Sequence, residues 1–384
     1  MAGSVHKDPD SKKWYYMLTI YDENGKRKQK KKRGFKTKGE AKAALIEAEN
    51  EVNKGTYIEP SKESFVKFIN DWYEIKKKSI PRSAKTTRIY IDKYIIPFFD
   101  NKVTLGNLKL KHVENFIEKM HTHPIKDKQD QVKQIGYAPS TIKRAMDIVK
   151  ASLEYAVMSG LIPKNVAKGA TLPKKKDSKE ELKVWTKEEM EIFLKHAEDD
   201  RLYILYYLAL MTGCRQGELL GLRWKDIDFE KNEITIAQVL SHDAKEFYEG
   251  AKTEAGNRKI IINNKTIEKL KEHKMLIESE KEKHGDGYVD NDLVVCTTIG
   301  TPYNPSNILN RSFKPLIKAS GVPSISFHGL RHSHATMLLE MGENIKLISD
   351  RLGHSDIKVT LSIYSHLLPS MQKQVTSKLD GLNF

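Results

Sequence analysis

Three stretches near the end of the chain read HGLRHSHAT at residues 328–336, RLGHS at residues 351–355 and LSIYSHL at residues 361–367. They place Arg331, His354 and Tyr364 within reach of a single helical hairpin. A second arginine, Arg215, lies far upstream in TGCRQGELLGLRW, and Glu218 follows it three residues later on the same predicted helix face. Basic side chains beside a phenol suggest that the phenol is a nucleophile that attacks a phosphodiester bound by the basic groups. These segments therefore predict a reaction centre, in which distant parts of the chain meet.

The residue types fit that chemistry. Arg215 and Arg331 each present a planar fork to phosphate oxygens, which neutralises charge as it builds during cleavage. The phenol of Tyr364 has an ordinary pKa of about 10, so it needs a partner or a cationic field, and His354 and the arginines can provide both. A leaving 5′-oxygen needs a proton. Lys252, between two predicted strands in GAKTEAGNRKI, can supply it if neighbouring cations lower its pKa.

The composition favours an anionic partner. The 384 residues carry a formal net charge of +15, which points to nucleic acid or to an acidic membrane surface. No apolar segment is long enough to span or anchor in a membrane, so nucleic acid is favoured and no membrane partner is expected. The first residues lack the apolar run of a secretion signal, and Cys214 and Cys296 imply no disulfide framework. We expect a cytoplasmic protein.

The length predicts two or three domains. Residues 14–35 alternate as a small sheet with a tight turn at Asn24-Gly25, and Thr37 with Glu40 forms a capping-box signal for a helix. From Lys26 to Lys38, nine of thirteen residues are basic and none is acidic. We interpret this as a DNA contact. The alternative is a solvated edge strand whose charges prevent aggregation.

The next segment follows a helical pattern. Helices are predicted at residues 65–78, 83–99, 110–120 and 139–160, between linkers at 55–64 and 172–184. From Trp185 the pattern mixes helices at 187–198 and 201–213 with strands at 233–239 and 258–264, and helices follow to the end. The predicted fold is therefore multidomain, with an α+β N-terminal part, an all-α part, and a mixed, mainly α part that contains a small β-sheet.

The segments TGCRQGELLGLRW, AKTEAGNR, HGLRHSHAT and LGHSDIKVTLSIYSHL strongly resemble the box motifs of the tyrosine recombinases of the phage integrase type, and the resemblance spans nearly the whole chain. It implies that Tyr364 is the nucleophile and that Glu218 supports the first arginine. It assigns phosphate activation and proton transfer to Arg215, Lys252, His328, Arg331 and His354. The hairpin departs from many relatives, which have proline before the lysine and serine near Gly256.

The resemblance also implies the domain plan. Residues 1–57 resemble an arm-site DNA-binding domain with a three-stranded sheet and a helix, residues 62–166 a helical core-site-binding domain, and residues 180–384 the catalytic domain. The predicted DNA contacts are Lys28, Lys30, Lys31, Lys32, Arg33, Lys36, Lys85, Arg88, Lys143 and Arg144.

The implied activity is site-specific cleavage and rejoining of double-stranded DNA through a 3′-phosphotyrosyl link, to integrate and excise a prophage or transposon. The covalent link keeps the bond energy, so neither ATP nor a metal cofactor is expected. The resemblance implies a homotetramer on core and arm attachment sites. An excisionase and a host DNA-bending protein are expected partners.

Two other interpretations are open. A type IB topoisomerase uses the same chemistry without joining different duplexes, and a DNA-binding regulator would leave the last segment catalytically silent. His328, His332, His334 and His354 lie at short spacings that could bind zinc, but no carboxylate or cysteine completes a recognisable set, so no metal site is predicted.

Overall fold

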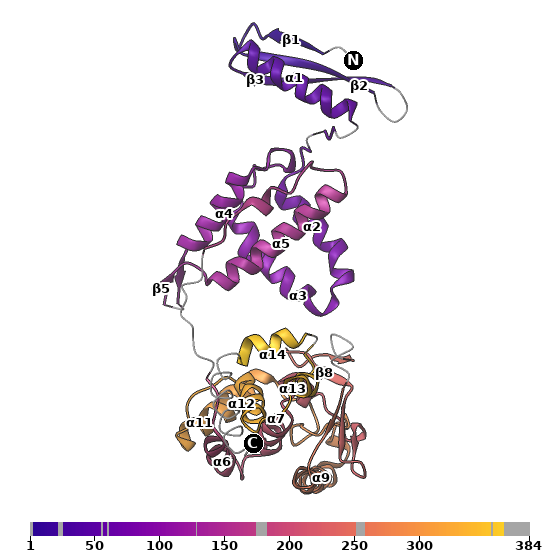
Figure 1. The fold of residues 1–384 in the computed structure, drawn as a ribbon, viewed down its shortest axis with the longest axis vertical. Coiled ribbons are helices and arrows are strands. Elements are labelled where there is room, and N and C mark those ends of the chain that lie inside the picture. The colour runs from indigo at the N-terminus through magenta and orange to yellow at the C-terminus, as the bar shows by residue number, and fades with distance from the viewer. Residues whose placement is uncertain are drawn as a thin grey trace, which may run out of the picture. The chain divides into compact units, whose positions relative to one another are not determined.

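Figure 1 shows the helices and strands of the protein in a computed structural model. The chain divides into two compact units, residues 1–178 and residues 179–384. The structure describes residues 3–21, 26–54, 57–59, 61–127, 129–173, 183–250, 258–354 and 356–364; the side chains of Val359 and of residues 362–364 lie outside this description. The predicted domain limits at residues 57, 62, 166 and 180 stay predictions.

The first unit begins with an antiparallel sheet in the order β1-β2-β3. Its elements are β1 (Ser4–Lys7), β2 (Trp14–Tyr21), β3 (Arg27–Phe35) and the helix α1 (Lys38–Asn53). The capping box predicted at Thr37 is confirmed: the Thr37 hydroxyl accepts from the Glu40 amide, and the Glu40 carboxylate accepts from the Thr37 amide. The predicted turn at Asn24-Gly25 lies outside the described residues.

One face of this sheet is covered by α1 (Figure 1). Tyr16 and Leu18 of β2 pack against Leu45 and Ala48 of α1, and all four are nearly inaccessible to solvent. Because side chains alternate across a strand, the neighbours of Tyr16 and Leu18 along β2 point to the opposite face. α1 therefore leaves that second face without a helical cover.

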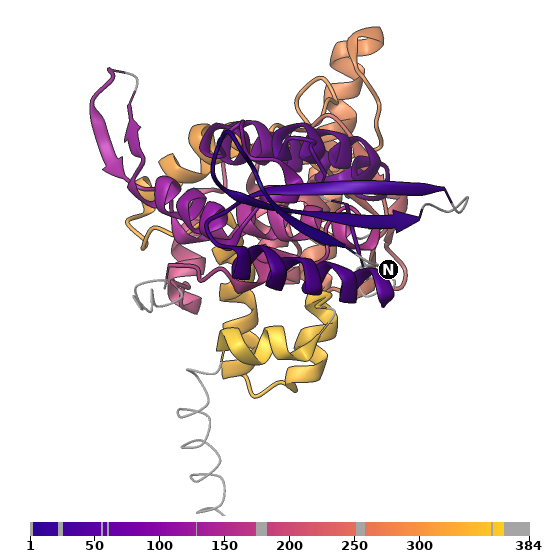
Figure 2. The same ribbon diagram turned by 90° about the horizontal axis from the view of Figure 1, so that it is seen from above.

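Helices make up most of the rest of the first unit. They are α2 (Phe65–Lys76), α3 (Pro81–Tyr90), α4 (Leu110–Thr122) and α5 (Pro139–Met158). The helix predicted at residues 83–99 changes to a π turn at Ile91–Ile95 and a 3₁₀ turn at Ile96–Phe98. Pro97 explains the change, because proline has no amide hydrogen and its ring clashes with the preceding turn. A short hairpin of β4 (Pro124–Lys126) and β5 (Val132–Ile135) projects beside these helices (Figure 2).

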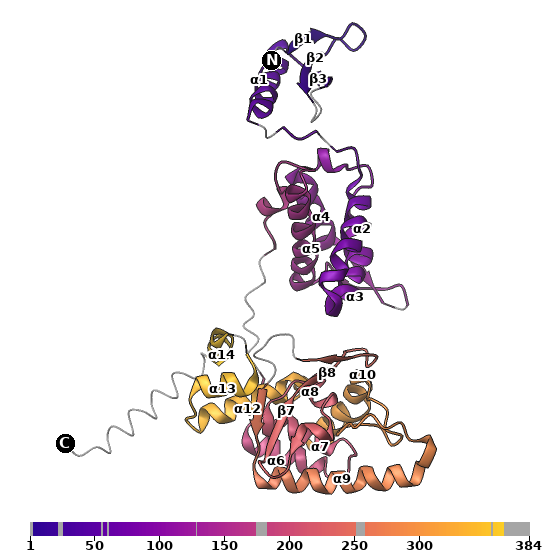
Figure 3. The same ribbon diagram turned by 90° about the vertical axis from the view of Figure 1, so that its right-hand side faces the viewer.

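The second unit is mainly helical. Its helices are α6 (Lys187–His196), α7 (Tyr203–Thr212), α8 (Gln216–Leu220), α9 (Asn264–His284), α10 (Pro305–Ile308), α11 (Lys314–Ser320), α12 (Phe327–Glu340), α13 (Ile345–Leu352) and α14 (Ile357–Tyr364). Its strands are β6 (Ile227–Asp228), β7 (Glu233–Ile236), β8 (Gln238–Leu240), β9 (Phe247–Glu249) and β10 (Arg258–Ile261). The small sheet has the order β10-β7-β6, and β8 pairs with β9. Figure 3 labels β7 and β8 among the helices of this unit.

The helix α7 forms the centre of the second unit. Most of its side chains are buried, in keeping with the apolar run YILYYLALM, and α12 packs against it. The helix ends at Gly213, whose φ of +67° favours glycine. A β-carbon on Gly213 would lie 2.6 Å from a ring carbon of His334 on α12 and 2.6 Å from a methyl of Leu352 on α13. Gly213 therefore permits the close approach of three helices.

Within the described residues, we find no helix that combines the length and the apolar character needed to cross a membrane.

The replacement Gly213→Ala should lower the free energy of unfolding by about 2–5 kcal/mol. The left-handed backbone accounts for about 1–2 kcal/mol of this loss, and overpacking against His334 and Leu352 accounts for about 1–3 kcal/mol. Urea unfolding of the purified protein measures the loss. Gly321→Ala is the matched control, because Gly321 ends α11 with a φ of +71° and a β-carbon added there would meet nothing within 4 Å. Equal losses in the two variants would contradict the packing argument.

Candidate active site

The carboxylate of Glu218 organises the beginning of α8. Its Oε2 accepts a hydrogen bond from the backbone amide of Arg215 at 2.8 Å, and its Oε1 accepts a hydrogen bond from Nη1 of the Arg215 side chain at 2.8 Å. Glu218 is 2% exposed, whereas the Arg215 side chain is 42% exposed. The buried carboxylate therefore holds one edge of a guanidinium whose side chain is partly exposed to solvent.

Arg331 lies on α12 and is 2% exposed. Its Nη1 donates to the Gly213 carbonyl at 2.8 Å, two residues before Arg215. Its Nη2 is buried and has no hydrogen-bond partner among the described atoms. Burial, and after it the charge of Arg215, lowers the pKa of Arg331 to about 10, so the guanidinium is still charged at neutral pH. A buried, charged N–H group without a partner is costly unless an anion meets it.

The segment after α13 joins the same site. Nη2 of Arg215 donates to the Gly353 carbonyl at 3.3 Å, and the next residue is His354. Nδ1 of His354 lies 2.8 Å from the hydroxyl of Thr360 on α14. Together with Arg331, these contacts bring the predicted residues Arg215, Glu218 and His354 into one place.

The histidines report a cationic environment. Burial, followed by the charges of Arg331 and Arg215, lowers the pKa of His354 to about 4. The same causes lower the pKa of His328, the second residue of α12, whose ring packs edge-on against His332 at 4.7 Å between centroids. Both rings are therefore neutral at pH 7 until an anion offsets the arginine charges.

Tyr364 is the last described residue of the chain and the last residue of α14. The contact between His354 and Thr360 ties this helix to the arginine site. The side chain of Tyr364 and the whole of Lys252 lie outside the described residues, so their predicted roles stay predictions.

Sequence reasoning assigned no role to two arginines of the site: Arg258, which is buried, and Arg351, which is partly buried. Arg258 begins β10 and donates to Glu218, and Arg351 on α13 donates to the carbonyls of Met211 and Ile261. A signal for Arg258 was present: it shares the strand face of Ile260, which is buried. A charged residue on an inward-facing strand position calls for a buried partner.

The other histidines of α12 have structural surroundings. His334 is buried, with Nδ1 2.7 Å from the Leu210 carbonyl, and its Nε2 accepts from Arg351 at 3.4 Å. His332 is partly buried against His328. Over the described part of the chain, no group of histidine, cysteine, aspartate and glutamate has a metal-binding arrangement.

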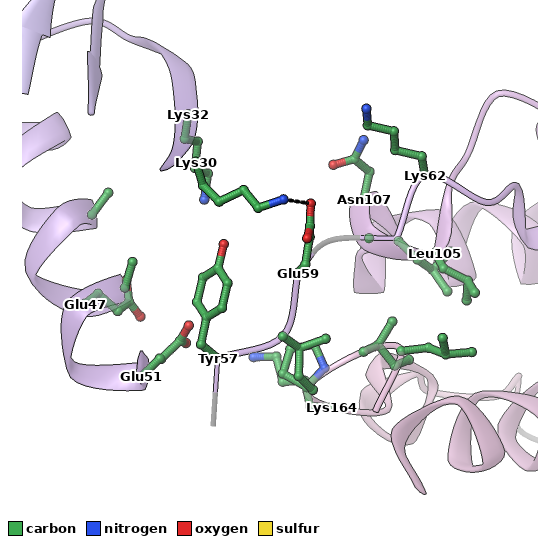
Figure 4. Close-up of a pocket in the computed structure, with 18 of the residues that line it drawn as sticks. Lys30, Lys32, Glu47, Glu51, Tyr57, Glu59, Lys62, Leu105, Asn107 and Lys164 are labelled. Carbon is green, nitrogen blue, oxygen red and sulfur yellow. Dashed lines mark hydrogen bonds and ion pairs between the residues drawn. The ribbon is translucent and has the colours of Figure 1, made fainter. Parts of the chain in front are cut away.

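The basic residues of β3 divide between the two faces of the N-terminal sheet. Lys28, Lys30 and Lys32 pair with Ile20, Leu18 and Tyr16, which lie on the face covered by α1. Figure 4 shows Lys30 directed at Glu59, with which it forms an ion pair. Lys32 lines the same pocket, with Glu47 and Glu51 of α1.

Lys31 and Arg33 are on the open face, where they pair with Met17 and Tyr15. The Lys31 ammonium lies 3.7 Å from the centre of the Tyr15 ring, a cation–π contact. Both basic side chains are exposed. Lys36 follows the strand and is also exposed; its amide donates to Glu40.

The predicted contacts of the helical segment lie on two helices. Lys85 and Arg88 are on α3, and Arg88 is engaged by Asp92 and stacks over the Tyr73 ring. Lys143 and Arg144 are exposed near the start of α5, where Lys143 lies 3.5 Å from Asp147. The structure places them on helix surfaces, and their role in DNA binding stays a prediction.

Comparisons with known proteins agree with the motifs. Residues 183–371 match the Phage integrase family, and residues 4–52 match the Arm DNA-binding domain. A "Tyrosine recombinase XerC-like" protein of Caldanaerobacter subterraneus is 31% identical, covering 97% of this chain and 96% of the relative. The ICEBs1 integrase of Bacillus subtilis is 29% identical, covering 71% of this chain and 75% of the relative.

Solved structures share the fold. The Tn1549 transposon integrase in complex with transposon right end DNA has a TM-score of 0.64 at 20% identity, covering 83% of this chain and 100% of that one. A lambda integrase dimer bound to a core site has a TM-score of 0.55 at 18% identity, covering 94% of this chain and 93% of that one.

The buried His334 should make stability depend on pH. Burial, and then the charge of Arg351, lowers its pKa from 6.5 to about 3. The unfolded chain therefore takes up a proton at His334 below pH 6.5, the folded chain does not, and stability falls as the pH falls toward 3. The variant His334→Gln lacks this titration. Between about pH 6 and 4, the unfolding free energy of the wild type should fall more steeply with falling pH than that of the variant. The difference between the two slopes should be about 1.4 kcal/mol per pH unit.

Urea unfolding at several pH values, followed by tryptophan fluorescence, measures the two slopes. His284→Gln is the control, because His284 lies exposed at the end of α9, and this variant should keep the wild-type slope. If His334→Gln also kept that slope, the buried ring would not be the neutral group inferred here.

Proposed function

The chain belongs to the phage integrase family of tyrosine recombinases, and we propose that Arg215, His328, Arg331 and His354 bind and activate a DNA phosphodiester for attack by Tyr364. The enzyme is a site-specific recombinase, the integrase of a mobile element. Lys252 is proposed as the proton donor, and Glu218 as the support of Arg215. The positions of Arg215, Glu218, His328, Arg331 and His354 support their proposed roles, whereas the roles of Lys252 and Tyr364 rest on the motifs alone.

One observation supports the proposal above the others. The buried Nη2 of Arg331 lacks a hydrogen-bond partner among the described atoms, and the partly exposed guanidinium of Arg215 is close enough to lower the Arg331 pKa. Two guanidinium groups that repel each other are stabilised when a phosphate lies between them. The two non-bridging oxygens of a phosphodiester match this need.

The reaction follows from these groups. The Oη of Tyr364 attacks phosphorus, the bond from phosphorus to the 5′-oxygen breaks, and a 3′-phosphotyrosyl link forms. Arg215 and Arg331 neutralise charge on the non-bridging oxygens, while the phenol proton passes to a nearby base and a proton reaches the leaving 5′-oxygen. Attack by the 5′-hydroxyl of a partner strand reverses these steps and releases the tyrosine.

We propose that neither a metal nor ATP takes part. The arginines supply the positive charge for which other nucleases use a cation, and the phosphotyrosyl link retains the energy of the broken bond. Neutral His328 and His354 can accept protons at pH 7, and the arriving phosphate would raise the pKa of each.

DNA is the proposed partner of both units. The sheet with its open basic face would bind arm sites, and the helices that carry Lys85, Arg88, Lys143 and Arg144 would bind core sites. A homotetramer on DNA, an excisionase, a host DNA-bending protein and a cytoplasmic location remain proposals. The match to an arm DNA-binding domain favours a recombinase over a type IB topoisomerase or a silent regulator.

Tyr364→Phe should abolish covalent cleavage and leave DNA binding intact, because only the attacking oxygen is removed. We would incubate the protein with nicked duplexes taken from the junctions that flank its gene, and measure the SDS-resistant adduct. Wild-type protein should form the adduct and the variant none, with dissociation constants within about threefold of each other. An adduct that persists in Tyr364→Phe would assign the nucleophile to another residue.

The two faces of the N-terminal sheet should differ in DNA binding. Lys31→Ala combined with Arg33→Ala removes two exposed charges from the open face, so the slope of log affinity against log salt should become shallower by about 2. Binding is measured by fluorescence anisotropy on duplexes that tile the ends of the element. Lys28→Ala with Lys32→Ala removes the same charge from the α1 face and should change the slope less. Equal changes would contradict docking by the open face.

A further inference from the structure

Arg258 connects three segments of the site through one buried guanidinium. Its Nη2 donates to Glu218 Oε2 at 2.9 Å and its Nη1 to Glu218 Oε1 at 3.3 Å. Its Nε donates to the Arg351 carbonyl at 2.6 Å, and its Nη2 also lies 3.5 Å from the Cys214 sulfur. The Arg258 side chain is 7% exposed. The fork of the guanidinium therefore points inward, and its donors are used by the protein itself.

The segments that Arg258 joins carry the predicted chemistry. Glu218 lies on α8 and holds Arg215, while Arg351 lies on α13, three residues before His354. Arg258 itself is the first described residue after the segment 251–257, which contains Lys252. Arg351 returns the contact, because its Nη1 donates to the carbonyl of Ile261 at the other end of β10. β10 is thus bound to α13 at both ends.

Glu218 is fully shared between the two arginines. Each of its oxygens accepts one bond from Arg215 and one from Arg258. Burial by itself would raise the pKa of this carboxyl, but Arg258 and then Arg215 outweigh it and hold the pKa below its ordinary value. A carboxylate with all four contacts filled cannot rotate without breaking an ion pair. The orientation of Arg215 therefore depends on Arg258, which is out of reach of solvent.

We propose that Arg258 is a positioning residue for strand cleavage: it fixes Glu218, and through Glu218 the phosphate-binding guanidinium of Arg215, while it anchors the end of α13 that leads to His354. This inference rests on the proposed function, because Arg215 and His354 matter here as phosphate-activating groups. Arg258 does not itself contact DNA in this scheme.

Three variants separate positioning from general stability. Arg258→Met removes the guanidinium at similar length, and Arg258→Lys keeps the charge but loses the fork that spans Glu218 and the Arg351 carbonyl. Arg201→Met is the matched control: Arg201 pairs with Glu280 and donates to the Cys296 carbonyl, so it is also a partly buried arginine bound to one carboxylate and one carbonyl. Arg201 belongs to no motif of the proposed site.

The experiment measures single-turnover adduct formation at saturating nicked duplex, the dissociation constant for the same duplex, and the melting temperature. We expect Arg258→Met to lower the adduct rate by about 100-fold and Arg258→Lys by about 10-fold, as for a misplaced catalytic group. Both variants should change the dissociation constant by less than about threefold. Arg201→Met should lower the melting temperature and leave the adduct rate unchanged. If either Arg258 variant does not fold, the other decides.

A second substrate identifies the route. In a duplex whose leaving 5′-oxygen is replaced by sulfur, departure needs no proton, so a defect in a proton donor such as Lys252 disappears while a defect in Arg215 persists. The Arg258 variants should remain slow on this substrate. Recovery of the wild-type rate, an unchanged rate on the ordinary substrate, or losses no larger than in Arg201→Met would overturn the inference. Wild-type protein that forms no adduct on either substrate would instead overturn the proposed function.

Discussion

Burial of positive charge constrains the catalytic unit more than any other interaction. Arg258 and Arg331 are buried in its interior, and Arg351 is partly buried next to Arg258. Within the described part of the chain, Glu218 is the carboxylate that pairs with Arg258 and with Arg215. Backbone carbonyls of Gly213, Met211, Ile261 and Arg351 accept most of the other bonds. Carbonyls satisfy hydrogen bonds but do not cancel charge, so the site keeps a positive excess that one phosphate can relieve. Burial, and after it the charges of Arg331 and Arg215, lowers the pKa of both His328 and His354.

Much of this arrangement could be predicted, because the residues of the site lie in short sequence motifs that are recognisable without a structure. The family resemblance predicted that Arg215, Glu218, Arg331 and His354 form one site, and the structure places them together. The capping box at Thr37 and the buried helix α7 were visible as local patterns. Tyr364 and Lys252 stay predictions, since nothing described reports their side chains.

Other features could not be predicted for physical reasons. The sequence from Lys26 to Lys38 shows a basic strand, but it does not show which basic side chains lie on which face of the sheet. That distribution depends on the register with β2 and on the side of the sheet against which α1 packs. The strand face of Arg258 indicated its burial, but neither its pairing with Glu218 nor the carbonyl contacts of Arg351 could be predicted, because these partners lie far away in the sequence. The split of residues 233–239 at Ala237 and the hairpin β4-β5 likewise follow from tertiary contacts.

The bonds that build the site also set the order in which it can form. The hydrogen bond between Arg331 and Gly213 joins residues 118 positions apart in the sequence. The bonds between Arg215 and Gly353 and between Arg258 and Arg351 join residues 138 and 93 positions apart. Contacts of such separation form only after long loops close, which slows folding. Arg215 can meet the carbonyl of Gly353 only after α13 has left the ribosome, so a growing chain that lacks α13 has an incomplete arginine site. The proposed cleavage site therefore requires synthesis of the chain at least through α13.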